Sequence, residues 1–150
     1  MTAKITEKQA VSNMLIERWE QTNAKLAAIA QELPEAKYET APVTGVRSAG
    51  DVLRHVAFWN HYVADIARGN KADDSANELP KKTYASKSQV IAALNRSAAE
   101  AAAALREHRD GLDLEKATLA ESFIEHVCEH YGQLVVYARW ARILPPASRG

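Results

Sequence analysis

The stretch HVCEHYGQLVVYARW (126–140) combines apolar residues at the period of an α-helix with two histidines, His126 and His130. Because four residues make about one helical turn, both imidazoles leave the same face of such a helix, with their Cβ atoms roughly 6 Å apart. Upstream, SAGDVLRHVAFWNHYV (48–63) predicts another helix, which carries His55. The two stretches therefore predict helices that can aim three imidazoles at one point.

The remaining sequence is rich in alanine, poor in glycine and apolar at the same period, which predicts an all-α fold. Three residue pairs fit the capping box, in which a hydroxyl and a side chain three residues later satisfy free backbone amides: Thr6 with Gln9, Ser86 with Gln89, and Thr118 with Glu121. With proline and glycine as stop signals, the predicted helices span 6–32, 49–68, 87–108 and 118–144. We expect one domain over 1–150, a four-helix bundle with long connections between helices 1 and 2 and between helices 2 and 3, and a crossover topology.

The depth of each histidine in its helix predicts how the helices are oriented. His55 lies about seven residues, or roughly 10 Å, into its helix, and His126 and His130 lie roughly 12–18 Å into theirs. Parallel helices would bring the three rings to similar depth, whereas antiparallel helices would need a large offset. The sequence thus predicts that these two helices are parallel.

The charge balance excludes some classes of function. The chain holds 19 basic and 19 acidic side chains, whereas a nucleic-acid-binding protein usually carries a basic excess on one face. The start MTAKITEKQA lacks an apolar signal segment, and no apolar run approaches the ~18 residues that span a bilayer. One cysteine, Cys128, excludes an intrachain disulfide, and we expect it to be a small core residue. We therefore expect a cytoplasmic protein that binds neither nucleic acid nor a membrane.

Both histidine stretches resemble the DinB-like family. In SAGDVLRHVAFWNHYV (48–63) a serine opens the helix and His55 follows Asp-Val-Leu-Arg, as in the second helix of these proteins. The form His-x3-His-x-Gly-Gln at 126–133 is similar to their fourth helix, and the helix order and spacing agree as well. The resemblance implies a metal-binding bundle, often a homodimer, that holds zinc or nickel on His55, His126 and His130.

Further side chains are expected near the metal. Gln133 and Tyr137 follow His126 on the same helix face, and Trp59 and Tyr62 lie near His55. Aromatic walls with a few polar groups suit a small-molecule pocket, so Trp59, Tyr62 and Tyr137 are candidate substrate contacts. Aromatic residues that simply fill the core are the alternative interpretation. Gln133 and Glu129 are candidate catalytic residues, and a solvated side chain is the alternative interpretation of Glu129.

The letters HVCEH (126–130) also fit the His-x-x-Glu-His motif of a class of zinc proteases, with Glu129 as the base. We discount that reading, because those enzymes need a further carboxylate ligand well downstream and only twenty residues follow His130. Gly132 lies inside the predicted helix, where glycine is unfavourable. A close approach by a neighbouring backbone is the expected reason for it.

Three neutral histidines leave a bound metal ion its full double charge and one open coordination position. A bound water would then have a pKa of about 7, or a bound thiol would ionise. The first case predicts a hydrolase of small esters or amides, and the second predicts transfer of a low-molecular-weight thiol to a small-molecule substrate. Thiol-dependent members of the resembling family favour the second. A non-catalytic metal-binding stress-response module is the alternative of a different class.

Overall fold

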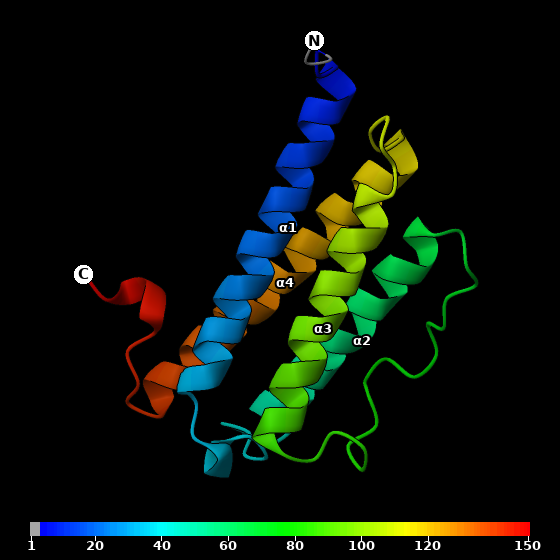
Figure 1. The fold of residues 1–150 in the computed structure, drawn as a ribbon. Helices are drawn as coiled ribbons and strands as arrows, with labels where there is room; N and C mark the ends of the chain where they lie inside the picture. The colour runs from blue at the N-terminus through cyan, green and yellow to red at the C-terminus, as the bar shows by residue number, and fades with distance from the viewer. Residues whose placement is uncertain (1–3) are drawn as a thin grey trace.

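The computed structural model describes residues 4–150 and is all-α, as predicted. It contains the helices α1 (Glu7–Glu32), α2 (Ala49–Ala67), α3 (Lys87–Arg106) and α4 (Leu114–Trp140), and the short 3₁₀ helices η1 (Glu35–Lys37) and η2 (Pro146–Ser148). Figure 1 shows the four long helices packed side by side as a bundle. None of the helices within the described residues is long and apolar enough to cross a membrane.

Local capping signals set most of the helix starts. The capping boxes at Thr6 and Ser86 are both present, so these two predictions are confirmed. The predicted start at Thr118 is wrong, because α4 begins four residues earlier, where the Asp113 side chain accepts a hydrogen bond from the Lys116 amide. Aspartate is as good an N-cap as threonine, so the sequence alone did not distinguish the two positions.

The prediction that α2 and α4 are parallel is wrong. In the view of Figure 1, α1 and α4 run downward along the chain while α2 and α3 run upward. Helix α2 packs along α3, and α1 packs along α4. The segment between α2 and α3 returns along the length of the bundle. The carboxyl end of α4 therefore lies beside the amino end of α2.

The earlier end of α4 explains why the histidines still meet. With α4 ending at Trp140 rather than at residue 144, His130 lies ten residues, or about 15 Å, from that end. His55 lies six residues, or about 9 Å, from the amino end of α2. His126 lies one turn further from that end, so an antiparallel pair needs an offset of between about one and two helical turns to bring the rings to the same level.

The core consists of apolar side chains from all four helices, and it includes a buried polar contact. Trp19 is fully buried, and its indole N–H donates to the Ala98 carbonyl at 3.0 Å. Asn60 of α2 donates to Asn23 of α1 at 3.1 Å and to Ser97 of α3 at 3.3 Å. Because buried polar groups must be paired, this contact favours one alignment of the three helices.

Two expectations about α4 are wrong. Cys128 is exposed rather than in the core, because the neighbouring Val127 takes the buried position. Cys128 instead borders a groove of about 490 Å³ between α1 and α4. Gly132 is exposed, and a Cβ added there would meet nothing within 4 Å, so no neighbouring backbone approaches it.

Gly132→Ala should therefore stabilise the protein. Alanine loses less conformational entropy than glycine in a helix, and we expect the free energy of unfolding to rise by about 1 kcal/mol. Urea denaturation measures this change. Gly111→Ala is the control and should destabilise the protein, because Gly111 has a φ of +91° and its added Cβ would lie 3.0 Å from the Lys8 backbone. Equal or lower stability of Gly132→Ala would contradict the prediction.

Candidate metal centre

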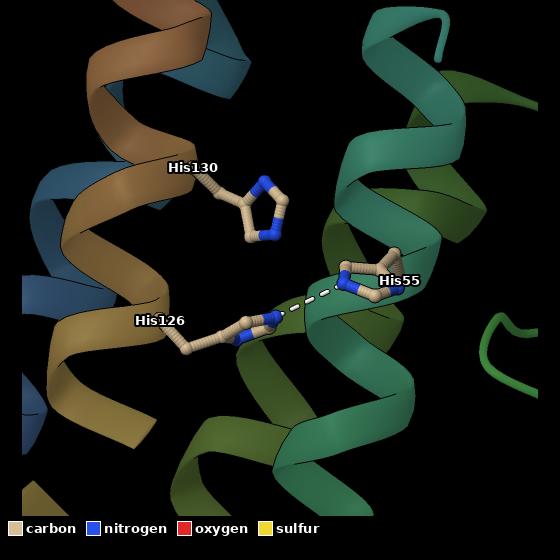
Figure 2. A group of neighbouring side chains, drawn as sticks. All are labelled: His55, His126 and His130. Carbon is tan, nitrogen blue, oxygen red and sulfur yellow. Dashed lines mark hydrogen bonds between the residues drawn. The ribbon is translucent and has the colours of Figure 1, made fainter. Parts of the chain in front are cut away.

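Three imidazoles converge between α2 and α4. Figure 2 shows His55 reaching across from α2 toward His126 and His130, which lie one turn apart on α4. One ring nitrogen from each residue lies within 4.8 Å of the other two. The Nε2 atoms of His55 and His126 are 3.0 Å apart. The structure thus brings together the three residues that the sequence singles out.

The orientation of His55 is set by the connection between α2 and α3. Its Nδ1 lies 2.7 Å from the backbone carbonyl oxygen of Asn77, which has a positive φ of 62°. A carbonyl oxygen can only accept, so Nδ1 carries the proton and donates it. The Nε2 atom of His55 is then unprotonated, and its lone pair is directed into the cluster.

A chain of three hydrogen bonds sets the orientation of His130. The Tyr137 hydroxyl donates to the Arg47 carbonyl at 2.8 Å, and the Gln133 amide donates to the Tyr137 oxygen at 2.8 Å. The remaining Gln133 oxygen lies 2.9 Å from Nδ1 of His130 and accepts its proton. Because the Arg47 carbonyl is only an acceptor, every bond in this chain has one direction. His130 is therefore also protonated on Nδ1, with Nε2 free.

His126 lacks such a partner. Its Nδ1 is buried and makes no hydrogen bond to any described residue. Its Nε2 faces the unprotonated Nε2 of His55, so without a metal His126 donates there. Two of the three rings are thus held by acceptors outside the cluster, and the third is held mainly by packing.

The surroundings keep the rings of His55 and His126 neutral. Burial lowers the pKa of His126 to about 3, with further lowering by the charges of His130, His55 and Arg47. Burial also lowers the pKa of His55; the hydrogen bond to Asn77 opposes this shift and the charge of Arg47 adds to it. Only a neutral imidazole has a lone pair for a metal ion. The rings of His55 and His126 are therefore in the metal-binding form at neutral pH.

Aromatic side chains form one wall beside the cluster. The Trp59 ring lies edge-on to His55 with centroids 6.4 Å apart, and it stacks on Phe123 at 5.7 Å. Tyr62 contacts both Trp59 and Phe123, at 5.1 and 5.7 Å. The Trp59 indole N–H donates to the Asn77 side chain at 2.9 Å, which connects this wall to the segment that holds His55.

The other candidate residues differ in their placement. Tyr137 is buried and is linked to His130 through Gln133, so it helps to orient that ring. Glu129 is exposed and makes no hydrogen bond or ion pair with the rest of the described chain. Phe123 was not predicted as a site residue, although its position three residues before His126 places it on the same helix face. The carbonyls of Asn77 and Arg47 were missed because backbone acceptors have no signature in the sequence.

The donor set fits a divalent transition metal. Imidazole nitrogen suits zinc and nickel, and the nitrogens of a tetrahedral zinc site lie about 3.3 Å apart at bonds of about 2.0–2.1 Å. The 3.0 Å contact between two Nε2 atoms is already near that spacing. Metal-binding histidines commonly donate their other N–H to a carbonyl or an amide oxygen, as His55 and His130 do here.

Comparison with known proteins gives one family. The family model described as the DinB superfamily matches residues 18–134, a range that includes all three histidines. None of the curated proteins and none of the solved structures matches the chain.

Proposed function

The chain belongs to the DinB superfamily, and on that basis we propose that it is a metal-dependent enzyme that transfers a low-molecular-weight thiol to a small electrophilic molecule. In this proposal His55, His126 and His130 hold zinc or nickel through Nε2. The single observation that carries the proposal is the convergence of three imidazole nitrogens within 4.8 Å between two helices. A metal ion with three neutral ligands supplies a Lewis acid that lowers the pKa of a bound thiol or water.

The residues of the chain contribute orientation and exclusion of water. The Asn77 carbonyl and the chain from Gln133 to Arg47 hold two rings in one tautomer, so little reorganisation is needed when an ion binds. The wall of Trp59, Phe123 and Tyr62 covers one side of the cluster with apolar surface. Such a wall favours a substrate with an apolar or aromatic body.

The proposal is tested with a panel of small thiols and the electrophile 1-chloro-2,4-dinitrobenzene. With at least one thiol, protein loaded with zinc or nickel is expected to form the thioether, with release of chloride and a proton, faster than the His126→Ala variant treated in the same way. Because the variant keeps the fold but loses a ligand, it measures the background rate. If no thiol reacts faster with the wild-type protein than with His126→Ala, thiol transfer is the wrong chemistry. Small-ester substrates then test the hydrolase alternative.

Gln133 gives a prediction about metal affinity. In Gln133→Leu, Nδ1 of His130 loses its acceptor, and we expect metal binding to weaken by about 10–100-fold. Gln133→Glu keeps an oxygen at the same place and should retain most of the affinity. Calorimetric titration with zinc measures both variants. Unchanged affinity in Gln133→Leu would show that the hydrogen-bonded chain does not position His130.

Four parts of the proposal stay predictions: the substrate, the thiol, the identity of the metal and the assembly into a homodimer. Sedimentation of the metal-loaded protein tests the dimer independently of the chemistry.

A further inference from the structure

We propose that Arg47 binds, through its free terminal amino groups, an anionic group, such as a carboxylate, of the small molecule that reaches the histidine cluster, and that this group competes with Glu78 for the charge of Arg47. The inference deepens the proposed function, because it takes the three histidines as the centre at which that molecule binds. It names the class of molecule: a small organic anion.

Arg47 and Glu78 are attached directly to the groups that orient the histidines. The Arg47 carbonyl ends the hydrogen-bonded chain that begins at His130. Glu78 follows Asn77, whose carbonyl holds His55. The two side chains come from different connections, one before α2 and one after it, and they meet with Nε of Arg47 2.6 Å from Oε1 of Glu78. This ion pair therefore joins the two segments that support the cluster.

The guanidinium of Arg47 has unused donors. Only its Nε donates within the described residues, and its two terminal amino groups make no hydrogen bond there. Arg54 provides the contrast: it is 1% exposed, and both terminal nitrogens bond to carboxylates or a carbonyl. The side chains of Arg47 and Glu78 are each 34% exposed, so solvent and ligands can reach them. A guanidinium with free terminal N–H groups suits a carboxylate, which can accept two of them.

The charge of Arg47 acts on the cluster. Burial is the largest cause of the lowered pKa of both His55 and His126, and the charge of Arg47 is a smaller cause at each, at His126 after the charges of His130 and His55. The charge of Glu78 opposes the shift at His55. A divalent ion on three neutral imidazoles would add two further positive charges to the same region. Glu78 alone does not balance that charge, so an incoming anion is favoured. A partly exposed ion pair such as Arg47–Glu78 stabilises the fold little, so exchanging its carboxylate has a small cost.

The test compares two thiols that differ in charge, 3-mercaptopropionate and 3-mercapto-1-propanol, in cobalt-substituted protein. Binding of sulfur to cobalt is followed by near-ultraviolet absorption, without turnover. Wild-type protein is expected to prefer the anionic thiol, and Arg47→Gln to reduce that preference by about tenfold. Comparing the ratio of the two affinities between proteins cancels the intrinsic acidity and chelating ability of each thiol. Glu78→Gln should increase the preference, because it removes the competing carboxylate.

Controls separate the role of Arg47 from general effects. Arg18→Gln, an exposed arginine on α1 beside the groove with Cys128, makes the same change of net charge away from the cluster and should leave the preference unchanged. Arg47→Gln keeps the backbone carbonyl that accepts from Tyr137 and removes a positive charge near the cluster, so zinc affinity should not fall below the wild-type value. An unchanged thiol preference in Arg47→Gln overturns the inference and leaves the proposed function standing.

Failure of both thiols to bind wild-type protein overturns the thiol part of the proposed function instead. In that case the binding of propionate and of 1-propanol to zinc-loaded protein is measured by ligand-observed nuclear magnetic resonance. This measurement tests whether Arg47 binds an anion without a thiol. Stronger binding of propionate to wild-type protein than to Arg47→Gln supports the inference, and equal binding overturns it.

Discussion

Zinc should raise the thermal unfolding midpoint of the wild-type protein and should leave that of His126→Ala unchanged. An ion that binds only the folded chain at a hundred times its Kd adds about 2.7 kcal/mol to the free energy of unfolding. For a domain of this size that corresponds to a rise of about 5–10 °C in the midpoint. Removing one of three ligands should weaken zinc binding by more than about a hundredfold, since loss of an outer partner alone commonly costs 10–100-fold. Scanning fluorimetry with and without zinc measures the difference.

His61→Ala is the matched control for this experiment. His61 also lies on α2, but its Nδ1 pairs with Glu100 at 3.0 Å and it is not part of the cluster. It should keep the full zinc-dependent shift. A zinc-dependent shift of the same size in His126→Ala would place the ion elsewhere on the protein. Chelator-treated wild-type protein should still unfold cooperatively, because the apolar core and the helix caps do not depend on the ion.

Arg54→Met should destabilise the protein strongly, by about 3–5 kcal/mol. Arg54 is 1% exposed, and its Nη2 donates to Asp51 at 2.8 Å and to Glu39 at 2.9 Å. Its Nη1 donates to the Tyr84 carbonyl at 2.9 Å. One buried charge thus ties α2 to the segments before and after it. Its loss leaves the Tyr84 carbonyl without this donor, and it leaves Glu39 and Asp51 only their contacts with Lys81 and Ser48. Chemical denaturation measures the free energy of unfolding.

Arg68→Met is the control for the loss of one positive charge. Arg68 lies at the carboxyl end of α2, is exposed and pairs with Glu107. We expect a loss of less than about 1 kcal/mol there. A loss of this small size in Arg54→Met would mean that its buried network is not coupled to folding.

The same network predicts acid sensitivity. Burial alone would raise the pKa of Asp51, but hydrogen bonds from Arg54 and Ser48 and the charge of Arg54 hold it below its usual value. Stability from a lowered carboxyl pKa is fully present above the unfolded value of about 4, and it is lost as the pH falls through the lower folded value. Arg54→Met should therefore lose less stability than the wild-type protein between neutral pH and about pH 3.

Much of the fold was predictable because its signals are local. The capping boxes of Thr6 and Ser86 depend on residues only three apart, and the structure contains both. The start of α4 could not be predicted, because Asp113 and Thr118 both qualify as N-caps. A contact from far along the chain decides between them: the Leu112 amide donates to the Ser12 hydroxyl at 2.7 Å and Leu112 is buried, which places the turn just before Asp113.

The candidate site divides in the same way. Spacing alone placed His126 and His130 on one helix face, and the helical pattern of 48–63 placed His55 on a second helix. The resemblance of the two stretches then implied that all three are metal ligands. The direction of α2 relative to α4 could not be predicted from the sequence, because connections as long as 33–48 and 68–86 can reach either end of a bundle.

By itself, the sequence determined the four helices and, on α2 and α4, the face that carries the histidines, because helical periodicity and caps act over a few residues. Only the tertiary structure decided that α2 and α4 are antiparallel. It also decided that the Asn77 carbonyl accepts a hydrogen bond from His55 and that the Arg47 carbonyl accepts one from Tyr137, at the end of the chain that begins at His130. The ion pair between Arg47 and Glu78 is a third contact of this kind. These groups are backbone atoms or loop side chains, and contacts distant in the sequence, such as those of Arg54, set their positions.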